Sequence, residues 1–426
     1  MLESNPSPAV EAANRRLGLF EAFGVELEYM IVDGDTLDVA PSADELLEAA
    51  AGELTDEYEN GDIAWNNELA LHVIEFKCNG PRPSLEGLAD AFAENTALAN
   101  SKLGARGQRL MPSAMHPWMD PSTVVLWPHG TRVIYETFDR IFGCKGHGWG
   151  NLQSAHVNLP FADDEEFARL HTAIRFLLPI LPGLAASSPL IGGERNGILD
   201  NRLVVYRDNC ATIPSITGQV IPEPIGSIGE YHEELLARLY RDLAPHDPEG
   251  VLRHEWVNAR GAIARFDRMT IEIRVLDVQE APVVDMAYVA LIVEVLKLLC
   301  AEQWCDLETL RAWRTEELAA LLDLAARRGE EADVGERRYL RALGFEGAGA
   351  SLAELWEHLG ETVSARGTLE RTTGRMLEHY LRHGSLATRI ARAVGPIPLR
   401  ATIRNVYEKL CEALETNEPF TPPGAR

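Results

Sequence analysis

Four stretches of the chain alternate between apolar residues and residues that carry chemistry. They run over 24–33, 71–78, 154–161 and 270–277. Successive side chains of a β-strand point to opposite faces, so each stretch predicts a strand with an apolar back and a polar front. The predicted fronts carry Glu26 and Glu28, then Glu75 and Lys77, then His156 and Asn158, then Glu272 and Arg274.

One strand of this kind is typical of a solvated sheet edge, and that interpretation stays open for Glu26 and Glu28 taken alone. Four such strands favour a different arrangement. We expect them to form one antiparallel sheet whose back packs on helices and whose front forms a charged basin.

Helical spacing of apolar residues predicts helices between the strands and throughout the last third of the chain. The expected helices lie at 84–103, 131–142, 163–178, 229–243, 284–304, 307–327, 351–363, 368–382 and 400–414. We therefore predict an α+β fold, in which a curved, mainly antiparallel sheet with helices on its back precedes a helical C-terminal portion. The expected division is a tail and short helix at 1–20, a catalytic sheet domain at 21–280, a helical portion packed on it at 281–415, and a disordered tail at 416–426.

Composition narrows the functional classes. The chain has 426 residues with a formal charge of −25, which argues against nucleic acid or an anionic membrane as a partner. It has no long apolar run and no signal-peptide pattern at its N-terminus, so we expect a cytoplasmic protein. The six cysteines are scattered without a Cys-x-x-Cys pair, which indicates reduced thiols and no zinc knuckle.

Two irregular segments stand out. The glycine-rich stretch 143–151 lacks the Gly-Lys-Ser/Thr ending of a P-loop, and a plain loop is favoured there over a nucleotide lid. The stretch 183–228 is rich in Gly, Pro, Ser and Asn, and includes the arginines Arg195, Arg202 and Arg207. A long irregular segment inside a domain is often functional, and the arginines favour that interpretation here.

Carboxylates with a single histidine point to Mg²⁺ or Mn²⁺, because structural zinc prefers cysteine and histidine. Arginines beside such a site fit phosphate recognition, since guanidinium groups bind phosphate oxygens bidentately. Four arginines fall within fifteen positions, namely Arg260, Arg265, Arg268 and Arg274. Arg260 and Arg268 taken singly are read as surface charges, whereas Arg274 shares a strand face with Glu272.

The Gly24-Val25-Glu26-Leu27-Glu28 motif, the strands of Glu75 and His156, and the motif from Thr270 to Asp277 occur in an order that resembles the second glutamate-cysteine ligase family. The resemblance covers roughly residues 20 to 300. That family comprises ATP-dependent carboxylate-amine ligases with a catalytic domain similar to glutamine synthetase. Asn158 departs from its pattern, because many members carry a second histidine there.

The resemblance implies a set of site residues. Two or three Mg²⁺ ions would be held by Glu26, Glu28, Glu75, His156 and Glu272. Catalysis would involve Glu272, Arg274 and Arg265, and ATP would be bound by Arg274, Arg265, Lys77 and Asn158. The substrate carboxylates are assigned to Arg202 and Arg207.

The resemblance also implies a reaction. Glutamate would attack the γ-phosphorus of ATP, and the amine of cysteine would displace phosphate from the acyl phosphate. Small-molecule partners are expected, namely ATP, an amino-acid carboxylate and an amine; a homo-oligomer is left open. The alternatives are a ligase of the same mechanism for another acid and amine, a phosphotransferase on the same fold, and a non-catalytic homologue.

Overall fold

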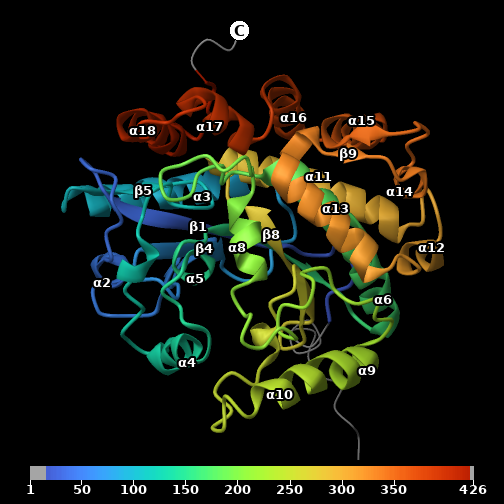
Figure 1. Cartoon of the computed structure of the whole chain (residues 1–426), viewed down its shortest axis with the longest axis horizontal. Coiled ribbons are helices and arrows are strands. Elements are labelled where there is room, and N and C mark those ends of the chain that lie inside the picture. Colours follow the sequence, from blue (N-terminus) through green and yellow to red (C-terminus); the bar gives the residue numbers. More distant parts are fainter. Residues whose placement is uncertain (1–15, 423–426) are drawn as a thin grey trace, which may run out of the picture.

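The computed structural model describes residues 16–422, and its centre is an eight-stranded sheet (Figure 1). The strand order is β2-β3-β4-β1-β6-β8-β7, and β5 pairs with β1 off this path. Every pairing in this sheet is antiparallel. The strands are β1 (Gly24–Asp33), β2 (Glu57–Asn60), β3 (Ile63–Asn67), β4 (Val73–Cys78), β5 (Gln108–Met111), β6 (Ser154–Pro160), β7 (Ala262–Arg265) and β8 (Thr270–Asp277).

The four strands predicted from alternation are neighbours in the order β4-β1-β6-β8. Their register places Glu28 opposite Glu75 and Glu26 opposite His156. Asn158 stands opposite Glu272. Directly opposed residues share a face of the sheet, so the polar fronts lie together. The predicted fold class is confirmed.

The back of the sheet is the main hydrophobic core. Val25, Leu27 and Tyr29 have no exposed surface and belong to one large cluster of buried residues. The same cluster includes apolar residues of α3 (Leu88–Gly104), α6 (Asp164–Leu177) and α11 (Pro282–Cys300). Most of α11 is buried, as expected for a helix that is apolar nearly all round.

The C-terminal portion is helical as predicted, with a break that the periodicity did not indicate. Asp306 caps α12, and Glu317 accepts from the backbone N–H of Arg314 at 3.1 Å at the start of α13, so the predicted helix 307–327 is two helices. Figure 1 shows α16, α17 and α18 along the top and α12 to α15 at the right. The elements are α12 (Leu307–Arg311), α13 (Thr315–Arg328), α14 (Arg337–Ala342), α15 (Leu352–Ala365), α16 (Arg371–His383), α17 (Leu386–Val394) and α18 (Arg400–Thr416), with the strand pair β9 (Asp333–Val334) and β10 (Ala350–Ser351).

Shorter elements connect the strands. The α-helices are α2 (Ala43–Ala51), α4 (Arg132–Phe142), α5 (His147–Gly150), α7 (Leu181–Ala185), α8 (Asn201–Arg207), α9 (Ile228–Glu230) and α10 (Ala237–Leu243). The 3₁₀ turns are η1 (Pro121–Thr123), η2 (Leu178–Ile180), η4 (Glu255–Val257) and η5 (Gly329–Glu331), and η3 (Tyr231–Leu236) is a π-helix between α9 and α10.

Both ends of the chain differ from the prediction where the structure describes them. Residues 16–20 form no helix and end in a turn, while the rest of the tail and short helix expected at 1–20 lies outside the described residues. Disorder was predicted after residue 416, but Phe420 is 5% exposed. Its backbone N–H donates to Glu280 Oε1 at 3.0 Å, and its carbonyl accepts from Arg389 at 2.6 Å. The buried ion pair of Arg389 and Glu280 therefore holds the backbone of Phe420 in place, and residues 423–426 lie outside the described part.

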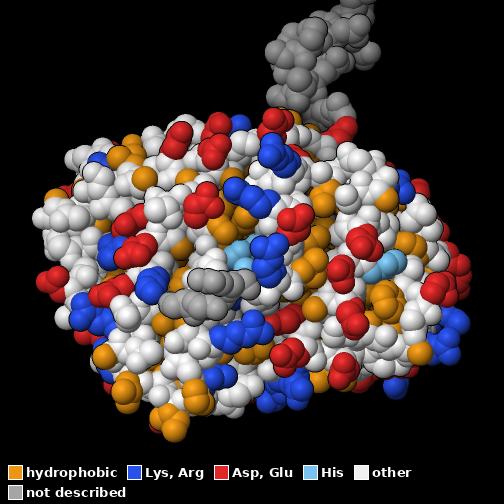
Figure 2. Space-filling view, turned by 90° about the horizontal axis from the view of Figure 1, so that it is seen from above, with side chains coloured by type: hydrophobic (Ala, Val, Ile, Leu, Met, Phe, Trp, Pro, Cys, Tyr) orange, Lys and Arg blue, Asp and Glu red, His pale blue; other side chains and the backbone are white. Residues whose placement is uncertain are grey.

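The surface is mixed in charge. Figure 2 shows acidic and basic side chains intermixed on one face of the molecule. The six cysteines are free thiols, four of them buried. Within residues 16–422, every helix is too short or too polar to cross a lipid bilayer.

Candidate active site

The polar fronts of the central strands line a cleft of about 370 Å³. The five predicted metal ligands all lie in its lining, namely Glu26, Glu28, Glu75, His156 and Glu272. Lys77, Arg202, Arg265, Arg268 and Arg274 line it as well. The structure thus brings together residues that are up to about 250 positions apart in sequence.

A hydrogen-bonded cluster of acids around His156 occupies the floor of the cleft. His156 Nδ1 lies 2.8 Å from Glu26 Oε2, and Nε2 lies 3.9 Å from Glu28 Oε1. Glu28 also accepts from the backbone N–H of Ser154 at 2.7 Å and from its hydroxyl at 3.0 Å. The β-strand register fixes these contacts, because Glu26 and His156 are directly opposed.

Opposite charges set the protonation of this pair. Burial alone would raise the pKa of Glu26, but the hydrogen bond and charge of His156 outweigh it and bring the pKa to about 2. Burial would lower the pKa of His156, but Glu26 and Glu28 raise it to about 9. The pair is therefore charged at neutral pH.

Like charges crowd the other side of the floor. Burial and the repulsion of Glu26 and Glu68 hold the pKa of Glu75 well above its usual range. Burial, with the charge of Glu28, raises the pKa of Glu68 to about 8. Each of these carboxylates would be stabilised in its charged form by a cation.

Two sets of ligand atoms are close enough to hold metal ions. One joins Glu26, Glu75 and His156, and the other joins Glu28, Glu68 and Glu75, with the ligand atoms of each set within 4.8 Å of one another. Glu75 belongs to both. The sequence prediction missed Glu68, which lies in the connection between β3 and β4 where no strand alternation marks it.

Glu272 faces two arginines. Arg265 NH1 donates to Glu272 Oε2 at 3.0 Å, and Arg274 NH2 donates to Oε1. Burial would raise the pKa of Glu272, but the charge of Arg274 outweighs it and keeps this pKa below its usual value. Its Oε1 is 4.0 Å from His156 Nδ1, so Glu272 borders the acid cluster and connects it to the arginines.

A second cavity of about 500 Å³ meets the cleft at Glu26, Lys77 and Arg268. Asn158 lines this cavity and donates to Glu26 Oε1 at 3.0 Å. Lys77 is paired with Glu57 at 2.6 Å. Most of the other lining residues are apolar or glycine, including Phe23, Gly24, Cys78, Gly80 and Pro160.

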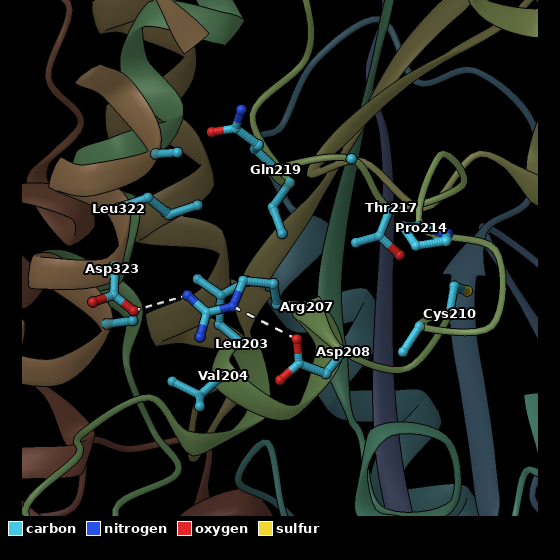
Figure 3. A pocket seen from close by; sticks show the side chains of 15 residues that line it. Leu203, Val204, Arg207, Asp208, Cys210, Pro214, Thr217, Gln219, Leu322 and Asp323 are labelled. Carbon is cyan, nitrogen blue, oxygen red and sulfur yellow. Dashed lines mark hydrogen bonds and ion pairs between the residues drawn. The ribbon is translucent and has the colours of Figure 1, made fainter. Parts of the chain in front are cut away.

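The two arginines predicted to bind substrate, Arg202 and Arg207, line different cavities. The segment 201–207 is helix α8 rather than the irregular chain that was expected. Arg202 lines the cleft and is fixed by Asp277, whose Oδ1 accepts from its Nε at 2.5 Å. Tyr206, one helical turn further on, also lines the cleft. Arg207 lines a different cavity and pairs with Asp323 at 2.9 Å (Figure 3).

The interpretation of Arg260 as a surface charge is wrong. Arg260 is fully buried and binds Glu223 through two nitrogen atoms, Nε at 2.5 Å and NH2 at 2.7 Å. This pairing holds it outside the lining of the cleft. Arg268, by contrast, is half exposed at the cleft and lies 3.9 Å from Glu26.

Comparison with known sequences decides the family. Residues 22–412 match the sequence model of glutamate-cysteine ligase family 2 (GCS2). The chain belongs to glutamate-cysteine ligase family 2. It is accordingly an ATP-dependent ligase of the carboxylate-amine type.

Similar sequences match this chain over most of its length. An uncharacterized protein of Archaeoglobus fulgidus is 35% identical over 337 residues, which are 78% of this chain and 91% of the relative. A Nocardioides protein named "Putative glutamate--cysteine ligase 2-1" is 26% identical over 82% of this chain and 85% of its own. The crystal structure of glutamate–cysteine ligase from Francisella tularensis in complex with AMP has a similar fold. Its TM-score is 0.60 at 13% identity, covering 94% of this chain and 90% of that one.

Aromatic residues form a further part of the cleft that the sequence prediction missed. Trp149 comes from the glycine-rich segment, which forms the single turn α5, and its Nε1 donates to Asn209 O at 2.9 Å. Phe138 packs on Trp149 and on Trp256, with ring centroids 5.1 and 6.0 Å apart. All three line the cleft. The sequence did not predict this aromatic cluster, because the three residues lie in separate segments and share no local pattern.

Proposed function

We propose that this family member is a glutamate–cysteine ligase that uses Mg²⁺ and ATP. The observation that carries the proposal is the buried acid cluster, in which two overlapping sets of ligand atoms share Glu75 and arginines stand at one border. Family membership alone does not assign metal and substrate roles to this cluster, and the metal and substrate dependence of turnover tests them.

The donor set fits Mg²⁺. Its ligands are carboxylate oxygens with one imidazole, the hard-donor chemistry that Mg²⁺ and Mn²⁺ take. Burial and the neighbouring acids raise the pKa of Glu68 and of Glu75, and a bound cation would favour the charged form of each carboxylate. Bound Mg²⁺ would supply positive charge for the phosphate oxygens of ATP.

The arginines would take the remaining phosphate charge. Arg265 and Arg274 both pair with Glu272 and line the cleft, and within the described residues the Nε of each is buried without a hydrogen-bond partner. Lys77 and Arg268 lie where the second cavity joins the cleft. We therefore assign the nucleoside half of ATP to that second, more apolar cavity and its phosphates to the junction.

The chemistry follows from this arrangement. The γ-carboxylate of glutamate attacks the γ-phosphorus of ATP, a C–O–P bond forms, and ADP leaves. The amine of cysteine then attacks the acyl carbon, the C–O bond to phosphate breaks, and the amine loses a proton. Such a reaction needs positioning and charge neutralisation rather than a protein nucleophile. Arg202 also lines the cleft, and its NH1 and NH2 groups would bind a substrate carboxylate while its Nε stays paired with Asp277.

An ADP-release assay with product mass measurement tests the proposal. ADP formation that needs glutamate, cysteine and Mg²⁺ together, with a product of the mass of γ-glutamylcysteine, supports it. ADP release with glutamate alone points to a phosphotransferase, and turnover only with another acid or amine points to a different ligase. If no acid and amine of the panel gives turnover, and the protein does not bind ATP, the proposal that it is an ATP-dependent enzyme is contradicted.

Metal dependence needs a matched pair of variants. Glu75→Gln removes the carboxylate common to both ligand sets and is expected to abolish Mg²⁺-dependent turnover. Glu59→Gln makes the same change on the exposed face of β2 and is expected to keep it. Equal activity of the two variants would remove Glu75 from the metal site.

A further inference from the structure

A third cavity lies on the other side of helix α8 from the cleft. It has a volume of about 400 Å³ and lies between α8, the segment 208–220 and α13 (Figure 3). Arg202 and Tyr206 line the cleft, whereas Leu203 and Arg207 line this cavity. Residues four apart lie on one face of a helix, so α8 separates two distinct binding spaces.

The lining combines an apolar floor with a rim of paired charges. Leu203, Leu322 and Pro214 contribute apolar surface. At the rim, Arg207 NH1 lies 2.9 Å from Asp323 Oδ1, and its Nε lies 4.0 Å from Asp208 Oδ1. Figure 3 shows Arg207 between these two carboxylates. A ligand at this rim therefore meets a guanidinium and a carboxylate side by side.

Two further observations indicate a ligand. Thr217 lines the cavity at 2% exposure, and among residues 16–422 its hydroxyl has the nearby thiol of Cys210 as its one hydrogen-bonding neighbour. A thiol is a weak hydrogen-bond partner, so this buried hydroxyl is poorly satisfied, and a stronger partner on a bound ligand can recover the free energy lost. Val220 in the same wall has a φ of 66°, a strained conformation for a β-branched residue. Such strain concentrates at functional sites.

We propose that this cavity binds a free α-amino acid with an apolar side chain. The volume lies in the lower part of the range for small-molecule sites, roughly 300–1,000 Å³. The carboxylate of the amino acid would bind the Arg207 fork in competition with Asp323, and its ammonium would bind Asp208. The apolar side chain would pack on Leu203 and Leu322. The site is separate from the ligase reaction and does not depend on the identity of its substrates.

Isothermal titration with L-leucine tests the proposal in the full-length protein without ATP. L-Leucine is expected to bind with one site per chain. Isocaproate lacks the ammonium and isoamylamine lacks the carboxylate, so each is expected to bind at least about tenfold more weakly. No heat with L-leucine up to millimolar concentration overturns the proposal, as does equal binding of all three probes.

Variants then locate the site. Ala319→Phe fills the cavity from α13 and is expected to weaken L-leucine binding at least about tenfold. Thr217→Val keeps the shape but removes the hydroxyl, and is expected to weaken it several-fold; it carries the test if circular dichroism shows Ala319→Phe to be unfolded. Glu272→Gln alters the cleft and is expected to leave binding unchanged. Binding that survives both cavity variants, or that is lost in Glu272→Gln, overturns the assignment.

Discussion

Acid should weaken the fold in part through His116, a buried histidine with no exposed surface. Its Nε2 donates to the carbonyl of Leu37 at 2.8 Å, and its Nδ1 accepts from the backbone N–H groups of Trp118 at 3.3 Å and Met119 at 3.0 Å. The ring is therefore neutral in the folded protein. A proton on Nδ1 would face two N–H donors and remove both hydrogen bonds.

The charged groups around the ring give the sign and size of the effect. Burial is the main cause that lowers the pKa of His116 to about 4. The charge of Arg400 acts in the same direction, the charge of Asp38 and the hydrogen bond to Leu37 oppose it, and His72 is a further titratable neighbour. One pKa unit corresponds to about 1.4 kcal/mol, so a shift from 6.5 to about 4 amounts to about 3 kcal/mol.

This contribution has a defined pH window. Above pH 6.5 both states leave the ring neutral, and the free energy of unfolding is unaffected. Between pH 6.5 and about 4 the unfolded chain binds a proton that the folded protein does not, so stability falls as pH falls. Below about pH 4 both states are protonated and the loss stops.

Urea unfolding at a series of pH values measures it. The native protein is expected to lose about 3 kcal/mol more than His116→Gln between pH 7 and pH 4, because the variant has no proton to bind there. Comparing each protein with itself removes any constant cost of the substitution. His246→Gln, at an exposed position, serves as the control and should follow the native protein. Equal pH slopes for the native protein and His116→Gln would refute the reasoning.

Three further changes test the site and the fold. Glu272→Gln should abolish metal-dependent ATP turnover while leaving the circular dichroism spectrum unchanged; near-normal ADP release would exclude Glu272 from the site. Glu68→Gln should raise the Mg²⁺ concentration needed for half-maximal activity by at least roughly tenfold, and an unchanged Mg²⁺ titration would contradict its role as a ligand. Arg389→Met leaves the buried Glu280 unpaired and should lower the free energy of unfolding by about 3–5 kcal/mol, measured in urea. Adding Glu280→Gln should recover part of that loss, and a cost below about 1 kcal/mol for Arg389→Met alone would show that the pair is not desolvated.

The alternation of apolar and polar residues along the strands predicted many of the residues that line the cleft. Each strand buries its odd or even residues by the same two-residue period, so the sequence alone indicated that Glu26, Glu75, His156 and Glu272 face away from the apolar core. The resemblance to the family indicated that these strands, in this order along the chain, contribute to one site. The structure adds the register, which sets the 2.8 Å contact between Glu26 and His156.

What the sequence could not indicate depended on contacts without a local pattern. Glu68 lies in a connection, where no period tells which way a side chain points. Arg202 and Arg207 both looked available for substrate, but the helical turn of α8 directs them to different cavities. Arg260 is neutralised by Glu223, a partner 37 positions away.

At the C-terminus, the sequence predicted disorder where the structure shows an ordered segment. Residues 417–422 have the composition of a loose tail, and only the tertiary structure provides Arg389 and Glu280 to bind Phe420. The sequence by itself thus determined which residues face the cleft on regular strands, because burial has a period there. Only the tertiary structure decided which charges meet, because ion pairing depends on distances between segments that are remote in the chain.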